Sequence, residues 1–313
     1  MNEKGMMMTL EDLPESCISH ILCFTTPRDV CRLSAVNQTF RLAGSSDSVW
    51  DKLLPIPYPH LLARLDSPLE ISSKKELYFA LCHPNWIDGR TKCTDWPTNM
   101  GFCVSAKKFW IQRATGKLCY MLSARNLDIT WGDDDRYWNW ISQDESSFNE
   151  IAKLVEVCWL EVKGQFDCKL LSPGAAYSVS FRLKVNELPR HIIQNFGRRV
   201  IIPFLPRAYG GWSHKPVKFS LTTPCGDHQI YARYLSDRDR PVETEGYQMA
   251  PFRHVEEGWM EFDAGRFVVE EKGDNPGNIE FCMREWDGGN WKRRLLLEGV
   301  KILPTSLVRE RAE

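Results

Sequence analysis

The apolar positions of this 313-residue chain change their spacing near residue 107. Before that point they recur every three or four residues, as on the buried face of a helix. After it they alternate with polar residues, as in strands that bury one face. The pattern predicts a helical N-terminal region followed by a β-rich region.

Three short helices are predicted between residues 12 and 50. In the first, Asp12 and Glu15 have the spacing of a capping box, and Pro14 falls in the first turn, where proline is tolerated. The apolar face of this helix is formed by Ile18, Ile21 and Leu22.

The next two helices have clear start signals. Thr26 can cap the second helix with Pro27 at its first position, and Asn37 can cap the third, which should end at Gly44. Residues 45–48 then read as a polar link. A unit of residues 8–54 is short of buried surface, so we expect it to need a partner or the rest of the chain for stability.

Residues 55–106 are predicted to connect the helical unit to the β-rich region. Prolines at positions 55, 57 and 59 make a stiff exit. Residues 60–82 carry two helical patterns, the second capped by Ser72 and Ser73, with Leu77, Tyr78 and Leu81 facing inward. Residues 84–106 mix glycine, proline and tryptophan, which favours a covering loop.

Residues 107–303 are predicted to form an antiparallel β-sandwich of jelly-roll kind, followed by a tail at 304–313. A hairpin is expected around residues 114–117, and the alternation over 176–185 predicts a strand with one wet face. Residues 155–162, apolar on both faces, predict a long central strand. Further strands are expected at 199–202, 216–221, 229–234, 258–262, 279–286 and 295–303. The fold class is therefore α+β.

The stretch from Ala124 to Trp140 combines aromatic residues with an acidic turn. Leu127, Ile129 and Trp131 have strand alternation, and Gly132 with three aspartates then makes a loop. Rings beside carboxylates and an arginine suit a ligand with an apolar ring face and many hydroxyl groups, such as a sugar. The alternative is that these tryptophans belong to the core.

The N-terminal pattern resembles an F-box, the motif by which substrate receptors dock on the Skp adaptor of cullin-RING ubiquitin ligases. The match runs from Leu10 to Trp50. The resemblance implies the Skp adaptor and the cullin scaffold as partners. The implied adaptor-binding residues are Leu13, Pro14, Ile18, Leu22, Val30, Leu33, Phe40 and Trp50.

The stretch 123–140 resembles the opening motif of the phloem protein 2 or Nictaba-like lectins of plants, and the similarity continues to residue 302. The resemblance implies binding of N-acetylglucosamine oligomers or N-glycans on glycoproteins. The implied carbohydrate-binding residues are Trp131, Trp138 and Glu285, with Asp135 and Tyr137 at the rim. One position departs from the family pattern, because Asn278 stands where a glutamate is expected.

Composition argues against several classes of function. The formal net charge of -1 argues against nucleic-acid binding, which needs a clustered excess of Lys and Arg. Eleven cysteines without paired spacing favour free thiols, and Cys82, His83, Cys93 and Cys103 match no zinc finger, so we expect no metal and no cofactor. No apolar stretch reaches the ~18 residues of a membrane span. We expect a cytoplasmic or nuclear protein without membrane insertion.

The sequence offers no catalytic residue. Asp133, Asp134 and Asp135 are adjacent and diverge, so they do not provide the two facing carboxyls of a glycoside hydrolase. Nucleophile elbows, phosphate-binding glycine loops and His-Glu-x-x-His motifs are absent from the sequence. Three hypotheses remain: a ligase receptor that recognises glycosylated protein, a receptor whose sandwich binds unmodified protein, and a stand-alone cytosolic lectin.

Overall fold

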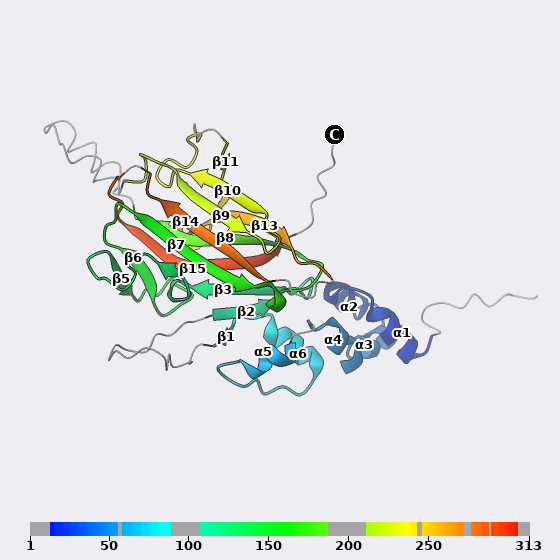
Figure 1. The fold of residues 1–313 in the computed structure, drawn as a ribbon. Coiled ribbons are helices and arrows are strands. Elements are labelled where there is room, and N and C mark those ends of the chain that lie inside the picture. Colours follow the sequence, from blue (N-terminus) through cyan, green and yellow to red (C-terminus); the bar gives the residue numbers. More distant parts are fainter. Residues whose placement is uncertain are drawn as a thin grey trace, which may run out of the picture. The chain divides into compact units, whose positions relative to one another are not determined.

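The computed structural model describes residues 13–55, 58–88, 107–186, 211–242, 246–271, 277–287 and 289–305. The chain divides into two compact units, one of residues 1–87 with 109–119 and one of residues 88–108 with 120–313. Figure 1 shows the helices in the first unit and most strands in the second. Asp12, the strand expected at 199–202, Cys93 and Cys103 lie outside the described residues.

The first unit contains six described helices. The second and third helices confirm their predicted caps, since the Thr26 hydroxyl accepts a hydrogen bond from the Asp29 amide at 3.2 Å and the Asn37 side chain accepts one from the Phe40 amide at 2.8 Å. The helices are α1 (Glu15–Leu22), α2 (Pro27–Leu33), α3 (Gln38–Ala43), α4 (Asp47–Leu53), α5 (Tyr58–Ala63) and α6 (Lys74–Leu81).

Two predictions about the F-box-like region are corrected. Pro14 is the residue before α1, not part of its first turn, and this helix start has no side-chain cap among the described residues. The polar link expected at 45–48 instead contains the start of α4. Burial explains this extra helix, because Trp50 is fully buried and its indole N–H donates to the Gly44 carbonyl at 2.8 Å.

A cluster of rings forms the core beneath α6. The Trp50 ring lies 5.1 Å from that of Tyr78 and 5.3 Å from that of Phe79. The Tyr78 hydroxyl donates to the carbonyl of Arg113 at 3.2 Å, which ties α6 to the turn between β2 (Lys107–Ile111) and β3 (Leu118–Ser123). The predicted hairpin is confirmed by the pairing of β2 with β3 and by the Gln112 amide, which donates to the Lys117 carbonyl at 2.7 Å. The structure adds a short strand, β1 (Asn85–Ile87), in the region expected to be irregular.

The second unit is built from two sheets. One has the order β3-β15-β8-β13-β12, with β6 also pairing β15 and β5 pairing β6, and the other has the order β11-β10-β9-β14-β7-β4. The strands are β4 (Asp128–Ile129), β5 (Trp138–Ile141), β6 (Ile151–Leu154), β7 (Leu160–Asp167), β8 (Ala176–Val185), β9 (Val217–Thr222), β10 (His228–Arg233), β11 (Gln248–Met249), β12 (Phe252–His254), β13 (Met260–Val268), β14 (Asn278–Glu285) and β15 (Leu295–Thr305).

Aromatic side chains join the two sheets into a sandwich. Phe181 of β8 lies 5.8 Å from Phe219 of β9, measured between ring centroids, and Phe219 stacks on Phe262 of β13 at 5.4 Å. Each contact crosses from one sheet to the other. Helices in the first unit and sheets in the second confirm the α+β class. Among the described strand pairs of the second unit, β10 and β11 are parallel, and pairs such as β9 with β10 and β9 with β14 are antiparallel.

The prediction that β8 has one solvent-exposed face is wrong. Residues 176–183 are buried throughout, including Arg182. The neighbouring strands β13 and β15 flank only the edges of β8. The face predicted to be polar is covered in part by Trp259, whose ring lies 5.6 Å from the Arg182 guanidinium. Arg182 is paired with the buried carboxylates of Glu261 and Glu298, and Glu261 also accepts Lys301 at 2.6 Å. Sequence alternation could not reveal these partners, since they come from distant strands.

The long strand predicted at 155–162 is also wrong. The chain leaves β6 after Leu154 and starts β7 at Leu160, and between them Val157 forms an isolated bridge with Lys292. The predicted run therefore covers a connection, in which Val157 is buried, and the first residues of β7. No helix in the described ranges is long and apolar enough to span a membrane.

Candidate functional site

The acidic turn predicted as a binding loop is held by its own backbone. After β4 the Gly132 amide donates to the Ile129 carbonyl at 2.8 Å, and the amides of Tyr137 and Trp138 both donate to the Asp134 carbonyl at 2.9 Å. Trp131 adopts a positive φ of 58°. A bulky residue rarely takes this conformation, so the surrounding turn must hold it there.

This strained backbone places the Trp131 ring at the surface. The side chain is 44% exposed, and its ring lies 4.9 Å from the half-buried ring of Tyr137 at an interplanar angle of 32°. The Arg136 guanidinium lies 5.4 Å from the same tyrosine ring. The structure therefore brings Trp131 and Tyr137 together as an exposed aromatic ledge.

The carboxylates of Asp134 and Asp135 in the turn differ in whether they form an ion pair. Arg136 binds Asp134 through two nitrogens, Nε to Oδ1 at 2.9 Å and a terminal nitrogen to Oδ2 at 2.6 Å. The Arg136 hydrogen bonds hold the pKa of the Asp134 carboxyl below its ordinary value. Asp135 is exposed and forms no ion pair with a described residue. Asp134 thus orders the turn, and Asp135 stays accessible beside it.

Trp138 is not at the surface, contrary to its predicted place in the sugar site. It starts β5, pairs with Leu154 of β6 and is only 2% exposed. Nearby Trp140 is half-buried, donates its indole N–H to the Gly132 carbonyl at 3.0 Å, and stacks with the Arg125 guanidinium at 3.5 Å. Both tryptophans support the ledge from inside the fold.

Glu285 is likewise buried, with 4% of its surface exposed. Its carboxylate pairs with the Nζ of Lys292, whose ammonium also donates to the carbonyls of Cys158 and Asn290 at 2.7 and 2.8 Å. This ion pair ties the end of β14 to the segment before β7. The surface placement expected for Glu285 is therefore corrected, since its charge is used within the fold.

The sequence reasoning missed a second aromatic ledge. Trp159, just before β7, is 44% exposed and stacks on Trp286, just after β14, at 4.7 Å and 30°. The Arg284 guanidinium lies 4.8 Å from the Trp286 ring. The Leu160–Glu285 register places the two tryptophans opposite each other, a pairing that only the sheet creates.

The two ledges lie at the same end of the six-stranded sheet. The Thr130 amide, one residue before Trp131, donates to the carbonyl of Glu161 at 3.1 Å, two residues after Trp159. The Glu161 carboxylate receives the Lys163 ammonium at 3.0 Å and the Thr130 hydroxyl at 3.5 Å. A carboxylate therefore lies in the same part of the sheet as the exposed rings.

The predicted adaptor-binding residues divide into core and surface. Most of them are buried in the helical unit, Leu13 and Leu33 are half-buried, and Pro14 is exposed. The buried members are Ile18, Leu22, Val30, Phe40 and Trp50. These residues are apolar because they form the core of the unit. They would affect adaptor binding indirectly, by holding the helices that present the surface residues.

Other apolar side chains cover the surface of this unit. Ile21 and Phe24, at the end of α1, are 44% and 76% exposed, Val36 before α3 is 62% exposed, and Leu42 of α3 is 51% exposed. Helices α1 and α3 are neighbours, joined by a hydrogen bond from the Ser19 hydroxyl to the Ala43 carbonyl. Exposed apolar side chains that gather on neighbouring helices are typical of interaction surfaces. Sequence periodicity could not separate these residues from the buried ones.

The described part of the chain shows no candidate metal centre and no disulfide. It holds no group of three or more His, Cys, Asp or Glu side chains placed to bind a metal ion. The cysteines in these ranges are free. Burial raises the pKa of the Cys282 thiol to about 11, which keeps this thiol protonated at neutral pH.

Comparison with known proteins gives two family matches. The family model for phloem protein 2 matches residues 117–304, and an F-box-like model matches residues 10–55. Among solved structures, a tandem CBM22 domain from a Paenibacillus barcinonensis protein covers 58% of this chain and 42% of its own, at 11% identity and a TM-score of 0.28. That similarity is too low to inform fold or function.

Curated relatives from Arabidopsis thaliana match nearly the whole chain. F-box protein At2g02240 is 38% identical over 296 residues, 94% of this chain and 79% of the relative. F-box protein PP2-A15 is 35% identical over 311 residues, 99% of this chain and 93% of the relative. The phloem protein 2 model covers more than half of the chain, and both relatives are more than 30% identical over most of their own length. This chain therefore belongs to the F-box proteins of the phloem protein 2 family.

Proposed function

We propose that this protein is the substrate-recognition subunit of a Skp-cullin-F-box ubiquitin ligase, and that its sandwich binds N-acetylglucosamine oligomers or N-glycans on target proteins. In this function the protein performs no chemistry itself. The helical unit binds the adaptor, and the sandwich recruits the substrate.

The adaptor arm of the proposal rests on the exposed apolar surface of Ile21, Phe24, Val36 and Leu42. Pro14 extends this set at the start of α1, with Leu13 partly exposed beside it. Apolar anchors that become buried at an interface commonly contribute ~2 kcal/mol or more each. A surface of this kind on a small helical unit favours a protein partner, and the F-box-like match supports a Skp adaptor as that partner.

The observation that carries the glycan arm is the Trp131–Tyr137 ledge, facing solvent beside free Asp135. A flat ring at the surface can stack on the apolar face of a pyranose with little loss of side-chain entropy. Carboxylate oxygens beside it accept hydrogen bonds from sugar hydroxyls, and bonds to a charged group are worth ~1.5–3 kcal/mol. Water competes for each hydroxyl, so we expect weak single-site binding, about -8 to -4 kcal/mol.

A second ledge, Trp159 on Trp286, lengthens this surface by another stacking position. The carboxylate of Glu161 lies beside Thr130 in the same part of the sheet, where it can accept hydrogen bonds from a sugar unit. Trp138 and Glu285 hold the ledges in place in this proposal, since each is buried against the segment that carries one of them. An oligosaccharide would therefore bind more strongly than a monosaccharide.

A second candidate, recognition of unmodified protein, is favoured by two departures from the expected sugar site. Asn278 replaces an expected glutamate and uses its amide to bind Gln165 at 3.2 Å. Glu285 has its charge paired inside the fold. Under this alternative the exposed tryptophans would contact protein side chains.

Calorimetry on the full chain with a chitooligosaccharide separates these candidates. Trp131→Ala should weaken binding at least tenfold, because it removes the stacking ring. Trp291→Ala is a matched control, as this tryptophan is equally exposed at 44% but belongs to neither ledge. Absence of heat with any chitooligosaccharide or N-glycan at millimolar concentration would exclude the glycan arm and leave protein recognition.

A further inference from the structure

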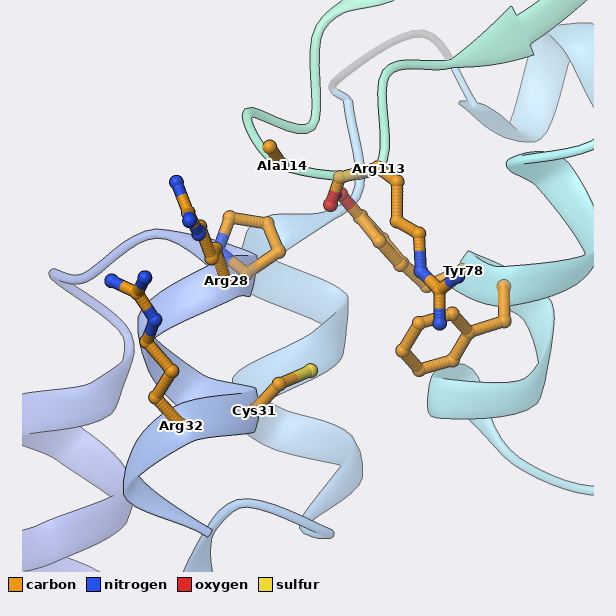
Figure 2. Close-up of a pocket in the computed structure, with 8 residues that line it drawn as sticks. Arg28, Cys31, Arg32, Tyr78, Arg113 and Ala114 are labelled. Carbon is orange, nitrogen blue, oxygen red and sulfur yellow. Dashed lines mark hydrogen bonds between the residues drawn. The ribbon is translucent and has the colours of Figure 1, made fainter. Parts of the chain in front are cut away.

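The first unit contains a cavity whose lining residues are not among those assigned above to adaptor or glycan binding. It lies between α2, α6 and the turn that joins β2 to β3, and its volume is about 410 Å³. This is within the ~300–1,000 Å³ typical of small-ligand sites. Figure 2 shows Arg28 and Arg32 together on the α2 side, with Arg113 across from them beside α6.

The wall of the cavity is strongly basic. Three arginines line it, and no lining residue is acidic. Arg28 and Arg113 form no ion pair with a described residue, and Arg32 has only a loose contact with Asp29 at 3.8 Å, where both side chains are largely exposed. Exposed pairs of this geometry are worth little. The Asp29 carboxylate is also taken by the Thr26 hydroxyl at 2.6 Å.

The back of the cavity is apolar and well supported. Pro27 and Tyr78 are buried, and half-buried Phe79 lies under the Arg113 guanidinium at 5.2 Å. The Tyr78 hydroxyl is already bound to the Arg113 carbonyl, and the Trp50 ring packs behind both aromatic rings. The floor therefore offers ring surface, and hydrogen bonding is left to the guanidinium groups.

We propose that this cavity binds a phosphate monoester carried on an aromatic ring, as in a phosphotyrosine side chain. The charge favours a dianion, because a phosphate dianion neutralises two of the three guanidinium charges and a carboxylate neutralises only one. A planar guanidinium group can donate two parallel N–H hydrogen bonds to two oxygens of one phosphate. The apolar floor and the volume give room for a ring, which inorganic phosphate would leave unfilled. A phosphorylated peptide bound here would link recognition by the receptor to phosphorylation.

Fluorescence anisotropy tests the proposal with the full chain and a short labelled phosphotyrosine peptide. Unlabelled phenyl phosphate should compete with the peptide, which separates recognition of the aryl phosphate from contacts with the peptide backbone. Benzoate and inorganic phosphate should each compete at least tenfold more weakly. Arg113→Ala and Arg28→Ala should each weaken peptide binding at least tenfold. Both side chains are exposed, so the variants should fold.

Arg41→Ala is the matched control, because Arg41 is an exposed arginine of α3 outside the cavity. Its peptide affinity should stay within about twofold of wild type. The proposal fails if the peptide does not bind at millimolar protein concentration, or if Arg113→Ala leaves its affinity unchanged. Equal binding of the unphosphorylated or phosphoserine peptide, or equal competition by benzoate, would also overturn it.

Discussion

The helical unit and the sandwich use their large apolar residues in parallel ways. In the helical unit, the recognisable residues Ile18, Leu22 and Trp50 are buried, while Phe24 beside them faces solvent. In the sandwich, Trp138 is buried, while Trp131 seven residues earlier is exposed. In both regions, the residues that make a motif recognisable include those that hold the fold.

The two regions differ in what surrounds their exposed rings. Phe24 stands with the aliphatic side chains of Ile21, Val36 and Leu42, a combination suited to a protein surface. Trp131 stands beside a tyrosine, an arginine and carboxylates, a combination suited to a hydroxylated ligand. Exposed aromatic rings in the two regions are therefore suited to different ligands. Substitutions of buried and of exposed residues should affect stability and binding differently.

The largest expected effect is the loss of a core ring in the sandwich. Trp138→Ala should destabilise the protein by about 3–5 kcal/mol, because it leaves a cavity under the acidic turn. Trp131→Ala should change stability by only about 0.5 kcal/mol. Urea denaturation of both variants measures the difference. Equal stabilities would show that the contrast between buried and exposed tryptophans is wrong.

A somewhat smaller effect is expected from the buried ionic cluster of the sandwich. Burial alone would raise the pKa of Glu261, but Lys301 and Arg253 outweigh it and hold this pKa below its ordinary value. Glu261→Gln should cost on the order of 3 kcal/mol at pH 7, since it leaves buried cations without their carboxylate.

This cost depends on pH in a defined direction. A lowered folded-state pKa stabilises the protein above the unfolded-state value of about 4.5 and loses that contribution as pH falls through the folded-state pKa. The stability difference between Glu261→Gln and wild type should therefore shrink below about pH 4.5. Denaturation curves at pH 7 and pH 3.5 check this, and a constant difference would contradict it.

The adaptor surface of the helical unit gives the next prediction. Phe24→Ala should reduce adaptor affinity at least tenfold, about 1.4 kcal/mol, because it removes an exposed apolar anchor. Copurification and a binding titration with a Skp adaptor measure this loss, and the melting temperature should stay near wild type. Arg41→Ala provides the surface control. Unchanged affinity in Phe24→Ala would remove this residue from the proposed interface.

The smallest expected effect concerns a local signal in the helical unit. Thr26→Ala should lower the free energy of unfolding by about 1 kcal/mol, because it removes the hydroxyl that caps α2. Thr26→Ser should keep the cap and serves as the control. If both variants unfold at the wild-type urea concentration, the cap does not contribute to stability as the sequence indicates.

Local chemistry determined much of this protein from sequence alone. The caps at Thr26 and Asn37 and the alternation in 176–185 depend on near neighbours, so the predicted elements formed at those places. The two domain families were also readable, because their motifs are short and continuous. The prediction failed for elements with weak local signals. One example is α4, which forms because Trp50 is buried.

Tertiary structure decided which side chains reach the surface. Trp138 and Glu285 are buried, and Glu285 has its charge paired with Lys292. The second face of β8 is buried where Arg182 meets the Trp259 ring and two buried carboxylates from other strands. The ledge of Trp159 on Trp286 exists only through the register of β7 with β14, residues more than a hundred positions apart. A sequence records each residue's chemistry, but distant segments supply the partners that bury or expose it.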